Sequence, residues 1–279
     1  TPPHIIEAAK NALDANKTHY TNSQGIYEFR EAIAETTESE LGYRPNLEQI
    51  LVCPANAIID FTIRCLVNPG EEVIFPDPGF PTYISAMVYN EIVPIGVQLK
   101  EENNFRMDPQ DISKKITAKT RLIIINSPQN PTGSVMTEEE IQAVYKIAKE
   151  YDLYVLIDEV YSKLIYEKTH HSPTIFDQCR ERTILLKSLS KAYAMSGWRL
   201  GYAVGPIQII EKMGLLLQTI MSCLPAFSQL GGVSALQGEQ KFLDEMVNIF
   251  RKRRDLLVDG LNHIPNVKCV KPEGAFYVM

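Results

Sequence analysis

The segment from Ser188 to Tyr202, SLSKAYAMSGWRLGY, gathers the residue types that an amine-based reaction needs. Lys191 lies among apolar side chains, and Arg199 follows eight residues later. A lysine that attacks a carbonyl must lose its proton near neutral pH, which a desolvated or electropositive setting favours. Arg199 could bind a phosphate through two hydrogen bonds, and the hydroxyls of Ser188 and Ser190, on one side of an extended chain, could assist it.

Such a grouping suits a lysine that carries an aldehyde cofactor bearing a phosphate. Taken alone, it has a plainer interpretation, a surface lysine near a buried arginine, and an isolated S-x-S-K is more often of that kind. The rest of the chain therefore has to decide between the two.

The composition is that of an ordinary globular protein, and it argues against several function classes. The chain has 279 residues, of which 45% are hydrophobic and 22% charged, enough for one large domain or two moderate ones. A net charge of -6 and a pI near 5.5 offer no positive field for nucleic acid or an anionic membrane. The five cysteines are odd in number and form no C-x-x-C, so we expect neither disulfides nor a metal site, and a cytoplasmic location. No apolar run approaches the ~18 residues of a membrane span.

Helical and strand patterns alternate along the chain, which is typical of a parallel sheet covered by helices. The predicted strands are 50–53, 72–75, 92–97, 122–125, 154–157, 183–186 and 200–204. The predicted helices are 3–15, 26–41, 57–67, 80–89, 138–150, 206–220 and 241–261. We therefore expect an α/β fold with a mostly parallel sheet sandwiched by helices. The RKRR run in the last helix is expected to be a solvated face rather than a nucleic-acid patch.

Polar residues follow four of these strands, where an open α/β sheet collects its ligands. Asn130 lies in the NSPQNPTG turn after the fourth strand, and Asp158 and Tyr161 follow the fifth. Ala55 and Asn56 open the helix after the first strand, and the amides of a helix start favour an anion. The lysine segment follows the sixth strand.

Each of these residues also has a plain interpretation: Asp158 as a helix cap, Asn130 as a turn residue and Tyr161 as a core aromatic. Together they are harder to dismiss. A pyridine ring needs an acid at its nitrogen, hydrogen bonds at its phenolic oxygen, an aromatic face, a phosphate site and a lysine at its aldehyde, and the chain has candidates for all five.

The motifs YTNSQGIYEFREAIA, DPGFPTY, NSPQNPTG, DEVY, SLSKAYAMSGWRLGY and PEGAFYV occur in this order along essentially the whole chain. In them the chain resembles the class I aminotransferases of fold type I, which use pyridoxal 5'-phosphate, and in particular the aspartate and aromatic aminotransferases. The resemblance implies that Lys191 forms a Schiff base with the cofactor and moves a proton at the substrate. It implies that Asp158 keeps the pyridine nitrogen protonated.

The resemblance also implies roles for the other candidates. Asn130 and Tyr161 would hydrogen-bond the phenolic oxygen, and Phe80, in DPGFPTY, would stack on the ring. The phosphate would be held by Arg199, Ser188, Ser190 and the amides of Ala55 and Asn56. Tyr20 resembles the tyrosine that reaches the phosphate of the neighbouring subunit, which implies a homodimer with shared active sites.

The activity implied is transfer of an amino group from an L-amino acid to a 2-oxo acid, of aspartate, aromatic or alanine type. Two alternatives remain: a C–S β-lyase or other elimination enzyme of the same fold, and a non-catalytic ligand-sensing module. Arg64 could bind a distal substrate carboxylate across the dimer, or it could simply pair with Asp60 one helical turn away.

Two departures from the family limit these expectations. Pro54 removes one amide that could reach the phosphate. The chain also stops at Met279, within what resembles a small-domain strand and before the family's arginine for the substrate α-carboxylate. We expect 15–262 to form the large cofactor-binding domain, with 1–14 and 263–279 belonging to a small α+β domain that is truncated.

Overall fold

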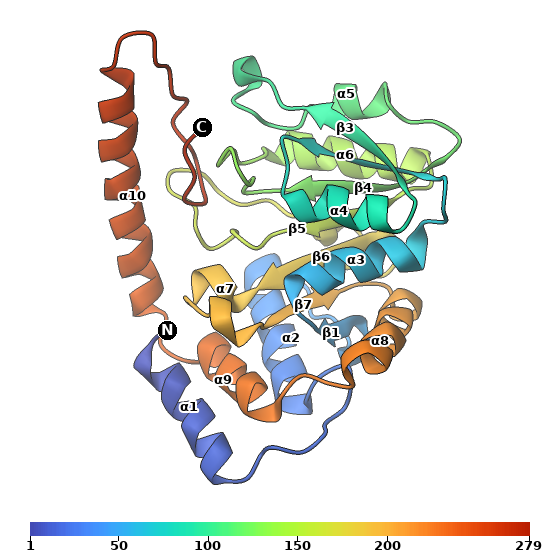
Figure 1. Cartoon of the computed structure of the whole chain (residues 1–279), viewed down its shortest axis with the longest axis vertical. Coiled ribbons are helices and arrows are strands. Elements are labelled where there is room, and N and C mark those ends of the chain that lie inside the picture. The colour runs from blue at the N-terminus through green and yellow to red at the C-terminus, as the bar shows by residue number, and fades with distance from the viewer. The chain divides into compact units, whose positions relative to one another are not determined.

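The computed structural model describes residues 1–279, and the chain divides into two compact units. The first unit consists of Thr1–Leu66 and Thr174–Glu239, and the second of Val67–Pro173 and Gln240–Met279. The helices and strands of both are labelled in Figure 1. The predicted boundaries of the large and small domains stay a prediction.

The first unit contains three strands and six α-helices. The strands are β1 (Ile50–Val52), β6 (Thr183–Ser188) and β7 (Gly201–Val204), and β7 lies between the other two and is antiparallel to both. The helices are α1 (Pro3–Asp14), α2 (Tyr27–Leu41), α3 (Ala55–Leu66), α7 (Leu189–Ala192), α8 (Ile207–Met221) and α9 (Ala226–Gln237). Every residue of β6 is buried, as expected for a strand covered on both faces. Figure 1 shows α1 lying beside α9.

The second unit is built on four parallel strands in the order β5-β4-β2-β3. They are β2 (Glu72–Asp77), β3 (Val93–Gln98), β4 (Thr120–Asn126) and β5 (Tyr154–Asp158), and the α-helices are α4 (Pro81–Tyr89), α5 (Pro109–Ser113), α6 (Glu138–Glu150) and α10 (Lys241–Asn262). The continuous apolar run of β4 is buried, which is typical of a central parallel strand. The start of α6 is fixed by a capping box, in which Thr137 and Glu140 each bond the other's backbone amide.

The α/β class with mostly parallel strands is confirmed, and each predicted strand and helix is present with ends shifted by at most two residues. Three α-helices were not predicted: the short α5 and α7, and α9. The α9 sequence has two adjacent glycines in its middle, which lower helix propensity, and no single apolar face. The burial of its residues comes from packing on α1 and α2, which is a tertiary effect that the local sequence does not show.

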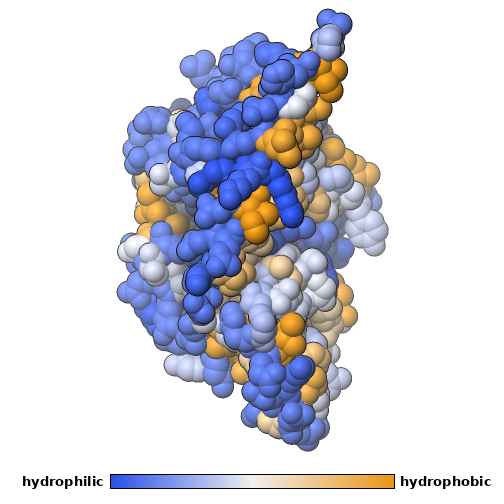
Figure 2. Space-filling view, turned by 90° about the vertical axis from the view of Figure 1, so that its left-hand side faces the viewer, coloured by the Kyte–Doolittle hydropathy of each residue, from blue (hydrophilic) through white to orange (hydrophobic).

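The RKRR run of α10 is only partly the solvated face that was expected. Lys252 and Arg253 are exposed, but Arg254 is 5% exposed, and its guanidinium pairs with Glu167 and lies over the ring of Tyr166. The expectation is wrong for Arg254 because Glu167, which its guanidinium binds, is 87 residues away in sequence. Figure 2 views the side of the molecule on which α10 lies in Figure 1, and shows hydrophobic patches on a mostly hydrophilic surface.

Two further findings concern metal binding and membrane spans, which the sequence analysis also considered. No group of three or more His, Cys, Asp or Glu side chains is placed to hold a metal ion. No helix combines the length and the apolar character that crossing a bilayer requires.

Candidate active site

In the first unit, three of the predicted phosphate-binding segments lie side by side because of strand pairing. Ser188, at the end of β6, pairs with Gly201 at the start of β7. On its other side Gly201 accepts a 3.0 Å hydrogen bond at its carbonyl from the amide of Cys53, two residues before α3 begins. A side chain at Gly201 would place its Cβ 2.8 Å from the Lys187 carbonyl oxygen and 3.2 Å from the Ala55 amide nitrogen, so this close approach needs a glycine.

The start of α3 has the character of an anion site. Ala55 and Asn56 are its first two residues, and amides there have no carbonyl of the same helix to bond. The helix dipole adds a partial positive charge at the same end. Pro54 precedes the helix, and its carbonyl accepts from the amides of Ala57 and Ile58 at 2.9 and 3.1 Å, so the proline serves as the helix start.

The two serines of the lysine segment are close together, but not in the way that was expected. Ser188 caps α7, and its hydroxyl oxygen accepts a 3.2 Å bond from the Ser190 amide. Ser190 already lies in the helix, so the expected extended chain is wrong here. The turn nevertheless brings the two hydroxyl oxygens within 3.0 Å, which keeps both available to one ligand.

Lys191 is the third residue of α7 and is half-buried. The short helix is fixed at both ends: the Leu189 amide donates to the Leu200 carbonyl at 3.1 Å, and the Met195 amide donates to the Ser190 carbonyl at 3.1 Å. A lysine on so short a helix is therefore positioned by its β6 and β7 neighbours rather than by the helix itself.

Arg199 adopts a left-handed backbone conformation with φ 57° and ψ 35°. Outside glycine this conformation costs roughly 1 kcal/mol, and such strain tends to be found at functional sites. The side chain is exposed, and Nη1 donates to the Ser196 carbonyl at 2.9 Å. The remaining guanidinium donors can serve an anion.

Tyr20 and Arg64, the other first-unit predictions, have different outcomes. Tyr20 is 88% exposed, which is unusual for an aromatic side chain in an isolated chain. Arg64 Nε lies 2.8 Å from a carboxylate oxygen of Asp60, so the ion pair that was the plainer interpretation is present.

In the second unit, Asp158 is the last residue of β5 and is 5% exposed. Its Oδ2 accepts a 2.6 Å bond from the Tyr83 hydroxyl, and its Oδ1 accepts a 3.1 Å bond from the Val160 amide. Burial raises the pKa of Asp158 to about 6, while these two bonds act in the opposite direction. The site thus holds an acid whose charge is costly and which favours a cationic partner.

Tyr83 connects Asp158 with the predicted ring-stacking residue. It is fully buried on α4, and the Phe80 ring meets its ring edge-on at 5.8 Å between centroids. Phe80 itself stands at the N-terminal cap of α4. The Tyr83 side chain therefore contacts both Phe80, the predicted aromatic face, and the carboxylate of Asp158.

Asn126 holds Asn130 in place through hydrogen bonds. It ends β4 directly opposite Asp158 in the strand register, and its amide nitrogen donates to the Asp158 carbonyl at 3.0 Å. Its side-chain oxygen accepts a 2.8 Å bond from the Asn130 amide. The NSPQNPTG turn is thereby tied to the end of β5.

Tyr161 lies in the turn after β5 and is 4% exposed. Its hydroxyl lies 2.6 Å from that of Tyr277, near the C-terminal end of the chain. Burial, and after it the bond with Tyr277, raises the pKa of Tyr161 above its usual value. The phenol therefore keeps its proton at neutral pH and can donate it to a ligand.

The structure thus brings Phe80, Asn130, Asp158 and Tyr161 together in one unit. It holds them by three residues that the sequence did not single out: Tyr83, Asn126 and Tyr277. Asn126 carried a signal, a polar residue ending a buried strand, and Tyr83 lies three residues after Phe80. Tyr277 lies in the PEGAFYV motif, but nothing local indicates that it contacts Tyr161.

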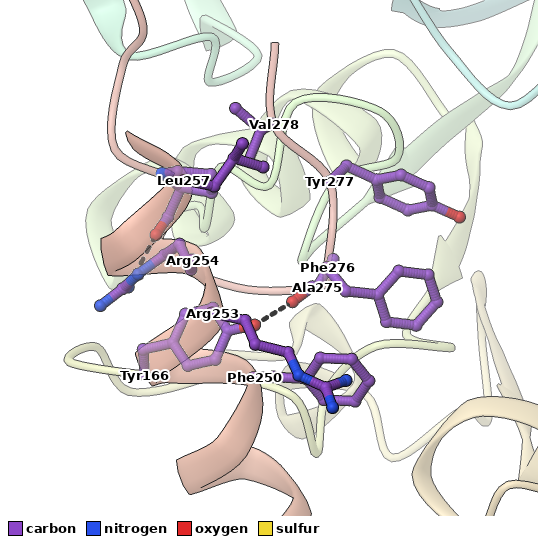
Figure 3. A pocket seen from close by; sticks show the side chains of 10 residues that line it. Tyr166, Phe250, Arg253, Arg254, Leu257, Ala275, Phe276, Tyr277 and Val278 are labelled. Carbon is purple, nitrogen blue, oxygen red and sulfur yellow. Dashed lines mark hydrogen bonds between the residues drawn. The ribbon is translucent and has the colours of Figure 1, made fainter. Parts of the chain in front are cut away.

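A cavity of about 330 Å³ in the second unit lies between α10 and the C-terminal segment, among Phe250, Leu257 and Phe276 (Figure 3). None of the predicted site residues lines it. Tyr277, whose hydroxyl lies 2.6 Å from that of Tyr161, is among its lining residues.

Comparisons with known proteins identify the family of the chain. The family model for aminotransferase class I and II matches residues 1–279, and the chain belongs to this family. It is 42% identical over 285 residues to the probable aspartate aminotransferase of Methanocaldococcus jannaschii, covering 100% of this chain and 74% of that protein.

Solved structures give the same result. The aspartate aminotransferase from Rhizobium meliloti superposes with a TM-score of 0.96 at 33% identity, over 100% of this chain and 70% of that one. The aromatic aminotransferase from Pyrococcus horikoshii gives 0.97 at 38% identity, over 100% and 76%. The protein is an aminotransferase that depends on pyridoxal 5'-phosphate.

The residues present fit that cofactor. The helix start at Ala55 is suited to a phosphate, and the buried acid at Asp158 is suited to a protonated ring nitrogen. Lys191 is suited to the aldehyde because it is partly withdrawn from solvent.

Proposed function

We propose that this protein transfers the amino group of an L-amino acid to a 2-oxo acid with Lys191 and Asp158 as its central catalytic residues. The observation that carries the proposal is Asp158: a carboxyl group at the end of a buried parallel strand, with its pKa raised to about 6 by burial. An acid that is costly to ionise alone becomes favourable beside a cation.

The bound cofactor supplies a cationic ring that withdraws electrons from the substrate α-carbon. Asp158 pairs with the ring nitrogen and keeps it protonated. The Tyr83 bond holds Asp158 in one orientation, and Asn130 and Tyr161 donate to the phenolic oxygen. Phe80 would cover one face of the ring and exclude water from it.

Lys191 would hold the cofactor at its aldehyde and, once the substrate amine is bound there, would be available as a free amine. Tethered beside the α-carbon, it accepts the α-proton and returns it to the neighbouring carbon as general base and then acid. The phosphate is held by the amides of Ala55 and Asn56 together with three side chains: Ser188, Ser190 and Arg199.

We infer that the protein acts as a homodimer, in which Tyr20 reaches the phosphate bound by the partner subunit. The support is its 88% exposure and its surroundings, a polar hollow of about 450 Å³ shared with the end of α8. On α8, Leu215, Ile220 and Met221 are also exposed, at 64%, 61% and 51%. Apolar exposure of this extent is typical of a surface that another subunit covers.

The first substrate to test is aspartate, because relatives at 40% identity and above carry that name, and aromatic amino acids and alanine follow. Arg64 is not assigned to the substrate, since it pairs with Asp60. The scattered reduced cysteines support a cytoplasmic location.

A half-reaction tests the proposal. The visible absorbance of the loaded full-length protein is expected to bleach on adding an amino acid and to return with a 2-oxo acid. A lyase would instead release ammonia without an oxo acid, and a sensor would bind without bleaching.

Lys191→Ala should abolish turnover, with partial recovery by added methylamine, whereas Lys10→Ala, at an exposed lysine of α1, should not change it. Turnover at the parent rate by a cofactor-loaded Lys191→Ala variant would overturn the assignment.

A further inference from the structure

Tyr277 lies 116 residues from Tyr161 in sequence, yet the two hydroxyl oxygens are 2.6 Å apart. The rings also meet edge-on, with 5.6 Å between centroids. Tyr161 is buried and Tyr277 half-buried, so this hydrogen bond is shielded from water on one side. A bond at this distance is short even for two hydroxyl groups.

The position of Tyr277 is fixed by its own segment rather than by the contact with Tyr161. The amides of Glu273 and Gly274 donate to the Gly133 carbonyl at 2.9 and 2.8 Å, which docks the segment on the NSPQNPTG turn. The Ala275 amide donates to the Leu164 carbonyl at 2.8 Å, which docks it on the turn that carries Tyr161.

Tyr166 provides a third attachment, since its hydroxyl donates to the Ala275 carbonyl. Figure 3 shows this bond, and it shows the Tyr277 side chain directed away from Leu257 and Arg254 on α10. Tyr277 is among the residues that line the apolar cavity, while its hydroxyl reaches that of Tyr161. The Tyr277 hydroxyl is held at a place set by backbone hydrogen bonds.

The proton count decides the direction of the Tyr161–Tyr277 bond in the loaded protein. Each phenol has one proton to donate. If Tyr161 gives its proton to the phenolic oxygen of the cofactor, only Tyr277 can supply the proton between the two hydroxyl oxygens. A phenol that accepts a hydrogen bond becomes a stronger donor, because linked hydrogen bonds polarise one another.

We propose that Tyr277 is a positioning residue for Tyr161: it donates to the Tyr161 hydroxyl and thereby directs the Tyr161 proton to the cofactor's phenolic oxygen. The inference rests on the proposed function, namely on the role of Tyr161. With Tyr277 in place, the acceptor of the Tyr161 proton is the anionic phenolate oxygen rather than another acceptor in the protein.

The test compares Tyr161→Phe, Tyr277→Phe and the double variant in the full-length loaded protein. The readouts are the pH midpoint of its visible absorbance change and the dissociation constant of the cofactor. Tyr277→Phe is expected to raise the pH midpoint of the absorbance change by roughly 0.5 to 1 pH unit. Without the Tyr277 bond, Tyr161 donates a weaker hydrogen bond to the phenolic oxygen of the cofactor and stabilises the phenolate less. The cofactor dissociation constant is expected to rise about 3- to 10-fold. The double variant should match Tyr161→Phe alone, since Tyr277 acts only through Tyr161.

Tyr166→Phe is the matched control, because it removes a hydroxyl bond from the same docked segment and leaves Tyr277 in place. The proposal requires that its midpoint stay within about 0.2 pH units of the parent's. An equal rise in Tyr166→Phe would mean that docking, not the Tyr277 hydroxyl, matters, and would overturn it.

Additive effects of Tyr161→Phe and Tyr277→Phe would overturn it as well. A normal midpoint in Tyr161→Phe would refute the proposed role of Tyr161 itself, whereas a shift there with none in Tyr277→Phe would refute only this inference.

Discussion

Asp158 should make the cofactor-free protein less stable at neutral pH than a variant that cannot ionise there. Its pKa is about 6 in the folded protein against an ordinary value of 3.8, and burial is the main cause. The pKa difference corresponds to roughly 3 kcal/mol, since one pH unit is worth about 1.4 kcal/mol. Asp158→Asn keeps an acceptor for the Val160 amide and a polar partner for Tyr83, so it removes the charge with little change in packing.

The sign follows from proton binding. Between about pH 4 and pH 6 the folded protein binds a proton at Asp158 that the unfolded chain has already lost. Stability contributed by this group is therefore fully present below pH 4 and is lost as the pH rises through 6. The variant should exceed the parent by under about 1 kcal/mol near pH 4 and by about 3 kcal/mol at pH 7.5.

Urea unfolding of the full-length, cofactor-free protein at fixed concentration, between pH 4 and pH 8, measures this difference. Asp111→Asn is the control: Lys100 and Lys114 hold the pKa of that partly buried carboxyl at about 2, so its effect should not change between pH 5 and pH 8. Saturating cofactor should reverse the order of parent and Asp158→Asn, because only the parent gains the ion pair. A difference between parent and variant that does not depend on pH would refute the reasoning.

The remaining predictions concern the residues that hold the ring-side site and α10. Asn126→Ala removes the side-chain donor to the carbonyls of Asp158 and Pro128 and the acceptor of the Asn130 amide; it should cost about 1 to 3 kcal/mol by urea unfolding and weaken cofactor binding in a titration. Gly133→Ala forces a side chain at φ +72° to within 2.5 Å of Pro272 Cβ; limited proteolysis should then cut the C-terminal segment faster, and an unchanged rate would count against its docking there. Arg254→Lys loses the paired bonds of a buried guanidinium to Glu167 and should lower stability by about 1 to 3 kcal/mol, whereas the exposed Lys252→Ala should not.

The sequence predicted the elements well because their signals are local. A run such as Leu122–Ile125 is apolar enough to identify a buried strand by itself, and the Thr137 capping box marks where α6 begins. Asp158 could be singled out for the same reason: it is an acid directly after a buried apolar strand. The helix α9 lacked such a signal, because only its packing partners make its residues helical.

The supporting residues could not be predicted because their partners are distant in the chain. Tyr83 and Asp158 are 75 residues apart, and Tyr161 and Tyr277 are 116 apart. A buried tyrosine has the same sequence appearance whether its hydroxyl meets a carboxylate or a carbonyl. The packing of α4 decides that Tyr83 meets Asp158, and the docking of the C-terminal segment decides that Tyr161 meets Tyr277.

Asp158 and Arg199 are each unfavourable for the protein without its cofactor, and for different reasons. Asp158 bears the cost of a buried ionisable group, and Arg199 bears that of a left-handed backbone with an exposed side chain. A fold selected for stability alone would have an amide at the first position and a glycine at the second. In the proposed site each choice would be explained by one part of the cofactor, the ring nitrogen for the acid and the phosphate for the arginine. Cofactor binding therefore offsets two local costs at once, so the loaded protein should gain more stability than either contact alone provides.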